Sequence, residues 1–202
     1  MKKLLFILLI VMFTTQIKAQ GTMPPVDMGG SIYVYNDQFP YGDLLCTITK
    51  RNDDKHFEVS VEGGYMAKYD DIIIIDSVLY TTKGRKYVFT ALNDRAFAEL
   101  PRLVSVIIPN SVTSIGTHAF YNCNSLKKII ISDSITSISD YMLCGCVALD
   151  SLTIPKSVVN IGKCAFYNCF DLKKITVYSK YASFGKNSFG NCPEELVVHG
   201  YA

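Results

Sequence analysis

The stretch LVSVIIPNSVTSIGTHAFYNC, residues Leu103–Cys123, decides the fold because the chain repeats it. The stretch LDSLTIPKSVVNIGKCAFYNC, Leu149–Cys169, is a near copy, and a degenerate third copy begins between them at Leu126. Together with Leu172, the leading leucines recur every 23 residues without slippage. A leucine-led period of roughly 20–29 residues predicts that each unit forms one coil of a stacked structure.

Apolar residues recur at fixed places after each leading leucine. Since one unit cannot bury its apolar edge alone, stacking identical units would bury these residues in continuous columns. The sequence therefore predicts a leucine-rich repeat solenoid. The columns are Val106, Ile129, Leu152, Ile175; Ile108, Ile131, Ile154, Val177; Val112, Ile135, Val158, Tyr181; Ile115, Ile138, Ile161, Phe184; Phe120, Leu143, Phe166, Phe189; and Cys123, Cys146, Cys169, Cys192.

Within one repeat, the local pattern is mainly that of β structure. The Leu-x-x-Ile-x-Ile segment alternates at period two and predicts a short strand, so stacked repeats form a parallel sheet with neighbouring strands about 4.8 Å apart. Pro109 and Pro155 end their strands, and a second short extended run leads to the turns at Gly116 and Gly162. The Ala-Phe-x-x-Cys piece is long enough for only one helical or 3₁₀ turn. The expected fold is a right-handed, mainly β coil.

The chain before Leu103 carries a different pattern. Residues 44–64 alternate around a polar turn and predict a β-hairpin, and residues 71–92 add a buried strand and a second hairpin. We expect residues 44–85 to form a cap over the open end of the solenoid. Residues 86–202 then hold one worn repeat and four full ones, and residues 20–43 form a loosely ordered segment.

The first 19 residues have the order of a secretory signal peptide. Lys2 and Lys3 precede a ten-residue apolar run, and Ala19 is the expected cleavage site. The run is too short for a transmembrane helix, which needs about 20 residues. Removal of residues 1–19 takes away Lys2, Lys3 and Lys18 and no acidic residue, so 20 basic and 18 acidic residues become 17 and 18, a formal charge of −1. The remaining charges are scattered, which disfavours a nucleic-acid partner.

The motif Leu-x-x-Ile-x-Ile-Pro-x-Ser-Val-Thr-x-Ile-Gly-x-x-Ala-Phe-x-x-Cys resembles the BspA-like, or Treponema-type, leucine-rich repeats of bacterial surface proteins. The resemblance covers roughly residues 44–198, and the lead-in at residues 71–97 resembles that of secreted members from Bacteroidetes. It implies an exported protein, secreted, periplasmic or on the cell surface, that attaches to host or neighbouring-cell proteins. The repeat that begins at Leu126 departs from the motif, with Met142-Leu143 for Ala-Phe and neither the proline nor the glycine.

Seven cysteines in an exported chain raise the question of disulfides. Four of them form the repeat column, which favours small buried core residues, and one or more disulfides between stacked neighbours remain an alternative. Zinc binding is disfavoured because neither paired Cys-x-x-Cys nor His-x₃-His spacing occurs. A nucleophile pair of Cys123 and His118 would place the thiol in the core column, where it reacts poorly. We expect no cofactor.

The outward side of the strand sheet is the candidate binding surface. Residues between the inward-facing positions combine lysines with exposed apolar side chains, a mixture that suits an acidic protein partner. An ordinary solvated sheet face is the alternative for each of them. Three functions remain open: a protein-binding or attachment module, a structural component that stacks end to end, and, least favoured, an enzyme. The candidate residues are Val104, Ile107, Lys127, Lys128, Ile130, Asp150, Thr153, Lys173, Lys174 and Thr176.

Overall fold

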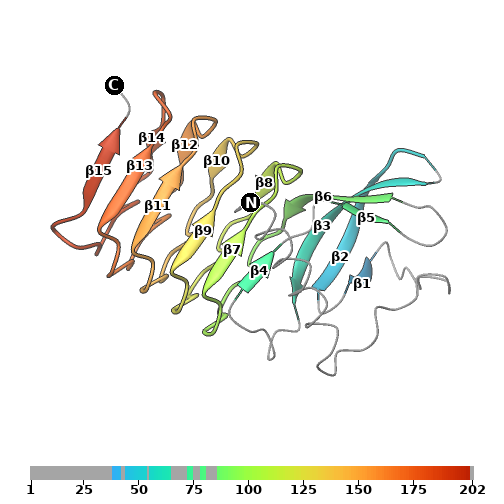
Figure 1. The fold of residues 1–202 in the computed structure, drawn as a ribbon, viewed down its shortest axis with the longest axis horizontal. Helices are drawn as coiled ribbons and strands as arrows, with labels where there is room; N and C mark the ends of the chain where they lie inside the picture. Colours follow the sequence, from blue (N-terminus) through green and yellow to red (C-terminus); the bar gives the residue numbers. More distant parts are fainter. Residues whose placement is uncertain are drawn as a thin grey trace, which may run out of the picture.

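The structure is a computed structural model that describes residues 38–41, 44–53, 55–64, 72–74, 78–80 and 86–200. The expected signal peptide and residues 20–37 lie outside these ranges. Successive coils of the chain stack into a solenoid, and a sheet of antiparallel and parallel strands stands at its N-terminal end (Figure 1). The predicted leucine-rich repeat coil with an N-terminal β cap is confirmed. None of the described segments is a helix of the length and hydropathy that a bilayer crossing needs.

One strand from each coil contributes to what we call the front face. These strands are β4 (Ile72–Ile74), β7 (Ser105–Ile107), β9 (Lys128–Ile130), β11 (Ser151–Ile154), β13 (Lys174–Val177) and β15 (Val197–Gly200). All ladders between them are parallel, and the pairing of Ser105 with Lys128 and of Ser151 with Lys174 keeps the 23-residue register. The strands form two ladders, β4-β7-β9 and β11-β13-β15.

A second row of short strands follows the front face in each coil. It comprises β8 (Ser114–Ile115), β10 (Ser137–Ile138), β12 (Asn160–Ile161) and β14 (Ser183–Phe184). Here β10, β12 and β14 pair in register, whereas β8 pairs with β6 (Lys86–Leu92) of the preceding coil. The second extended run predicted for each repeat is therefore present.

The rest of each coil forms the back, where the expectation of a helical or 3₁₀ turn is wrong. The described residues contain neither, only hydrogen-bonded turns. Two residues four apart in each coil adopt positive φ, such as His118 (57°) and Asn122 (55°), which interrupts right-handed helix. Alternate amides instead donate to the next coil, as Phe120 N–H does to Met142 C=O at 2.9 Å. On the back, backbone hydrogen bonds therefore join neighbouring coils, whereas in a helix the same amides would bond within one coil.

The predicted columns form the core. The four leading leucines and nearly all residues of the first three coils in each column are under 8% exposed. The rings of Phe166 and Phe189 stack with centroids 5.3 Å apart. The expectation fails in the last coil, where Tyr181 is 82% and Phe184 47% exposed, because no further described coil covers that side.

The cap is a sheet in the order β1-β2-β3-β6-β5. The hairpin of β2 (Leu44–Arg51) and β3 (His56–Gly64) is confirmed, as is the antiparallel pairing of β5 (Val78–Tyr80) with β6. Two expected boundaries differ. Strand β1 (Gln38–Tyr41) pairs with β2 although it falls in the segment expected to be loosely ordered. Strand β6 belongs to both the cap sheet and the first coil, since it pairs with β3 and with β8.

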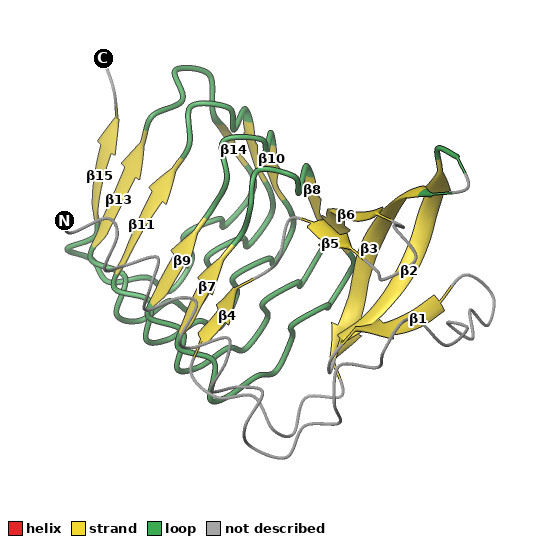
Figure 2. Cartoon of the chain, turned by 45° about the vertical axis from the view of Figure 1, so that its right-hand side comes forward, coloured by secondary structure: helices red, strands yellow, loops and turns green. Residues whose placement is uncertain are grey.

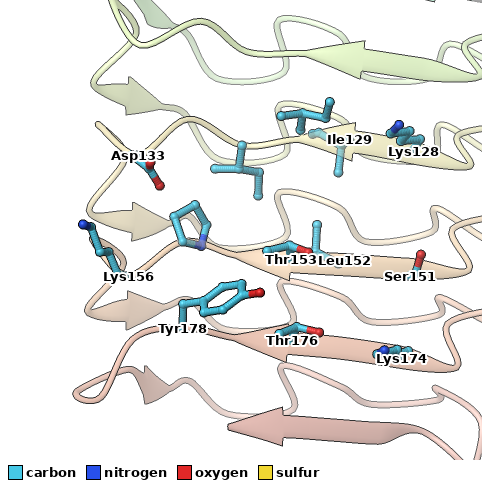
Figure 3. Close-up of a pocket in the computed structure, with 13 residues that line it drawn as sticks. Lys128, Ile129, Asp133, Ser151, Leu152, Thr153, Lys156, Lys174, Thr176 and Tyr178 are labelled. Carbon is cyan, nitrogen blue, oxygen red and sulfur yellow. The ribbon is translucent and has the colours of Figure 1, made fainter. Parts of the chain in front are cut away.

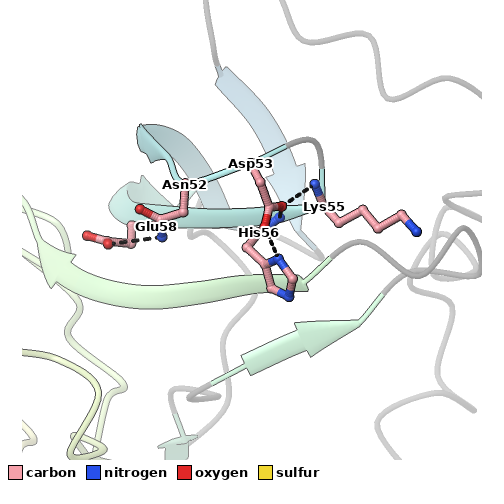
Figure 4. Close-up of polar contacts among 5 residues, drawn as sticks. All are labelled: Asn52, Asp53, Lys55, His56 and Glu58. Atoms are coloured by element: carbon pink, nitrogen blue, oxygen red, sulfur yellow. Dashed lines mark hydrogen bonds and ion pairs between the residues drawn. The ribbon is translucent and has the colours of Figure 1, made fainter.

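The β2–β3 turn is organised by one carboxylate (Figure 4). Asp53 accepts hydrogen bonds from the backbone N–H groups of Lys55 and His56, both at 2.7 Å, and contacts His56 Nδ1 at 2.6 Å. The backbone hydrogen bond from Lys55, followed by the side chain of His56, lowers the pKa of Asp53. These contacts account for the turn locally, so we assign it a structural role.

Candidate binding groove on the front face

All ten candidate residues lie on or beside the front strands, with unequal exposure. Both lysine pairs, Ile130, Asp150 and Thr153 are exposed, whereas Val104, Ile107 and Thr176 are half-buried. Ile130, with 43% of its surface exposed, is the clearest apolar contact among them. The expected pair of exposed isoleucines is therefore reduced to one, because Ile107 is partly covered.

The structure gathers five of these residues around an open groove of about 810 Å³ (Figure 3). They are Lys128, Ile130, Thr153, Lys174 and Thr176, whereas Val104, Ile107, Lys127, Asp150 and Lys173 lie outside its lining. The groove also includes residues that sequence reasoning did not select: Ile129, Ile131, Asp133, Ser151, Leu152, Pro155, Lys156 and Tyr178. Its volume falls in the range of about 300–1,000 Å³ of sites for small ligands.

The groove forms because side-chain size changes from coil to coil in two outward columns. In one column, Ser151 stands between Lys128 and Lys174; in the next, Thr153 follows Ile130. In the first column a small side chain thus lies between two long ones, whereas in the second the longer side chain is on the β9 side only, because Thr153 pairs with Thr176 on β13. The outward columns vary freely because they pack against no neighbouring coil, unlike the inward ones.

A break in strand pairing runs beneath the groove. Strands β9 and β11 lie side by side (Figures 1 and 2), but no ladder joins them among the described strands. The equivalent residue of the next coil, Tyr178, donates its backbone N–H to Ile154 C=O at 3.0 Å, a bond that Pro155 cannot make because it has no N–H. This one missing bond does not account for the break, because β7 pairs with β4 although Pro109 follows it at the same position.

The charges of the groove are predominantly positive. Lys128, Lys156 and Lys174 are exposed, and Asp133 is the one acidic residue of the lining. Within the described part of the chain, no carboxylate lies within ion-pair distance of these lysines. Exposed lysines without a partner leave the site available to an anionic ligand.

The cysteines supply neither a ligand-binding group of the groove nor a reactive nucleophile. All seven are free thiols, and the four of the repeat column donate to a backbone carbonyl of the preceding coil, as Cys123 does to Phe97 C=O at 3.1 Å. Burial raises the pKa of Cys123 to about 12, so it is a poor nucleophile. Its proposed partner His118 instead stacks on Tyr141, with ring centroids 4.7 Å apart. The described residues contain no group of three or more His, Cys, Asp or Glu that could hold a metal ion.

Comparison with known proteins identifies the family of the repeat. A family model described as BspA type leucine rich repeat region matches residues 89–197 in 6 copies. The chain belongs to this family. A search of curated proteins gave no match. Repeats of this kind are generally non-catalytic modules for protein interaction, which agrees with a site built from an exposed sheet face.

Solved structures of bacterial leucine-rich repeat proteins share the fold. A leucine-rich cell surface protein from Faecalibacterium prausnitzii is 24% identical with a TM-score of 0.67, covering 82% of this chain and 40% of its own. A leucine-rich repeat protein from Bacteroides ovatus is 28% identical with a TM-score of 0.65 (81% and 41%). The T. pallidum leucine-rich repeat protein is 24% identical with a TM-score of 0.66 (80% and 70%). The chain thus spans about two fifths of the length of the first two.

Proposed function

We propose that this protein is an exported, non-catalytic module that attaches to a protein on a host or neighbouring cell through its front face. The observation that carries the proposal is the groove: an accessible sheet face on which unpaired lysines stand beside exposed apolar side chains. Mixed surfaces of this kind suit protein partners. Membership of a family with cell-surface relatives supports export and attachment.

Capture from cell-surface and matrix extracts by the immobilised exported chain (residues 20–202) tests this function. The variant Lys127→Glu/Lys128→Glu/Lys173→Glu/Lys174→Glu reverses the charge of the front face and should lose the captured proteins. A variant with the same change of charge, Lys55→Glu/Lys163→Glu/Lys180→Glu/Lys186→Glu, reverses four exposed lysines outside the groove lining and should keep them. Equal capture by the front-face variant and the unmodified chain would contradict attachment through this face.

End-to-end association is the second candidate, because the last described coil presents apolar side chains. Tyr181, Phe184 and Val198 are between 47% and 82% exposed there. If copies stack on this surface, sedimentation velocity should show concentration-dependent oligomers that Phe184→Asp/Val198→Asp abolishes. A monomer at all concentrations would remove this candidate.

A further inference from the structure

The front groove differs in chemistry from one end to the other. Figure 3 shows Lys128 and Lys174 at one end of strands β9 and β13, and Tyr178, Asp133 and Lys156 toward the other end. Ser151 and Thr153 line the floor between the two ends. A ligand that fits the whole groove must therefore match two different surfaces in a fixed order.

The first end is arranged for a single carboxylate. Lys128 and Lys174 occupy equivalent positions two coils apart, so their Cα atoms are separated by about 9.6 Å, twice the strand spacing. Ser151 stands between them, and its hydroxyl donates to Asp150 at 2.8 Å. A carboxylate placed above Ser151 would lie between the two exposed lysines, whose two positive charges outweigh the single negative charge of Asp150.

The second end is apolar and almost neutral. Tyr178 exposes 44% of its surface beside the buried ring of Pro155, and Ile130, in the column of Thr153, adds an apolar side chain between the two ends. Asp133 and Lys156 at this end carry opposite charges. Aromatic and apolar surface of this kind favours an apolar side chain of the ligand.

The distance between the two ends selects an extended peptide. The lining follows β11 from Ser151 to Thr153 and continues to Pro155, four residue steps, which correspond to about 13 Å of extended chain. We propose that the groove binds an extended segment of about five residues from a protein partner, with an acidic residue between Lys128 and Lys174 and an apolar residue against Tyr178. This inference rests on the proposed function and names the chemistry of the partner.

A polyanion such as a sulfated polysaccharide fits less well. Its charges repeat along its whole length, whereas the groove has unbalanced positive charge at one end only. The apolar end would then gain no contact. The combination of one charged and one apolar subsite is what a peptide with an acidic and an aromatic residue provides.

Two synthetic peptides test the inference, since either chain direction could fit: acetyl-Glu-Thr-Val-Thr-Phe-amide and acetyl-Phe-Thr-Val-Thr-Glu-amide. Titration into the exported chain, followed by backbone amide NMR signals, should shift the signals of Ser151 and Thr153 and saturate with a dissociation constant below about 1 mM. The same peptide with Gln in place of Glu should bind several-fold more weakly. Binding should also weaken as the salt concentration rises.

The decisive protein variants are matched in charge and exposure. Lys128→Gln/Lys174→Gln should weaken the better peptide by about five- to thirtyfold. Lys180→Gln/Lys186→Gln removes two exposed lysines outside the groove lining and should leave affinity unchanged. Tyr178→Ala should weaken the Phe peptide but not its Ala analogue.

Three results would overturn the inference: no saturable binding of either peptide up to about 1 mM, equal losses in both lysine pairs, or tighter binding of a sulfated tetrasaccharide than of either peptide. These failures are separable from failure of the proposed function. If the chain captures surface proteins but binds neither peptide, the groove chemistry is wrong and attachment stands. If the chain binds a peptide but captures no surface protein, the groove chemistry stands and attachment to surface proteins is wrong.

Discussion

Replacing Gly162 by alanine should loosen the stacking of two coils. A Cβ atom at this position would lie 2.5 Å from Asp140 Oδ1, 2.6 Å from its backbone nitrogen and 2.8 Å from the carbonyl carbon of Ser139. Two of these atoms belong to the backbone of the preceding coil, so no rotamer change relieves the contact. Separation of the coils would also stretch the bonds from Gly162 N–H to Ile138 C=O and from Lys163 N–H to Asp140, now 2.8 and 2.7 Å.

The magnitude follows from two opposing terms. Overpacking of a well-packed site costs about 1–3 kcal/mol, whereas the loss of glycine flexibility in the unfolded chain returns about 0.4–1 kcal/mol. We therefore expect Gly162→Ala to lower the free energy of unfolding by about 1–2 kcal/mol. For a chain of this size, that corresponds to a drop in Tm of about 2–8 °C.

Urea unfolding followed by circular dichroism measures this change; the chain has no tryptophan for fluorescence. Gly200→Ala is the matched control, since nothing lies within 4 Å of a Cβ atom there, and it should change the free energy of unfolding by less than about 0.5 kcal/mol. A Gly162→Ala protein as stable as the unmodified chain would refute the claim that a Cβ atom at this position clashes with the preceding coil. So would an equal loss in the control.

Three further predictions concern the core and the front face. Phe166→Ala removes a fully buried ring and should lower the free energy of unfolding by about 3–5 kcal/mol. Phe184→Ala changes an exposed ring and should lower it by less than about 1 kcal/mol. Similar urea midpoints for the two variants would contradict this prediction. Burial raises the pKa of Cys123 from 9.0 to about 12, so the thiol's stabilising contribution is complete below pH 9 and is lost as the pH rises toward 12. The free energy of unfolding of Cys123→Ala should therefore decline less between pH 9 and 12 than that of the unmodified chain, which alkaline unfolding measures. Strand β11 pairs on one side and β13 on both, so hydrogen exchange should be faster in β11, and equal protection would argue for a ladder beneath the groove.

The core was predictable because its chemistry repeats. The spacing of Leu103, Leu126, Leu149 and Leu172 fixed the coil length, and the columns between them named the buried residues. The cysteine column followed as well, and its thiols add a regular hydrogen bond between coils. What repeats in sequence is what each coil must share in order to stack on the next.

The back turns and the groove were not predictable in the same way. The positive φ values at His118, Tyr141 and Cys164 fall on residues of three different types, because bonds between coils rather than side-chain preference impose them. The candidate face was chosen from alternation and repeat spacing, which place Ser151 between Lys128 and Lys174 but do not show that a groove opens there. The unpaired junction between β9 and β11 was not predictable from proline either, because β7 pairs with β4 although Pro109 follows it at the position of Pro155.

The repeat that begins at Leu126 connects these features. Where the motif has proline and glycine, this coil has Ser132 and Ser139, whose hydroxyls donate to the carbonyls of Val112 and Ile115 in the preceding coil. These side-chain hydrogen bonds join the two coils near β8 and β10, which form no ladder with each other among the described strands. The same coil lacks a ladder to β11 on the front face, where the groove opens. Its inward columns remain buried, so the solenoid stays continuous while the surface departs from uniformity. The groove therefore opens at the junction of the irregular repeat with the coil that follows, where Lys128 and Ile130 come from one side and Ser151 and Thr153 from the other.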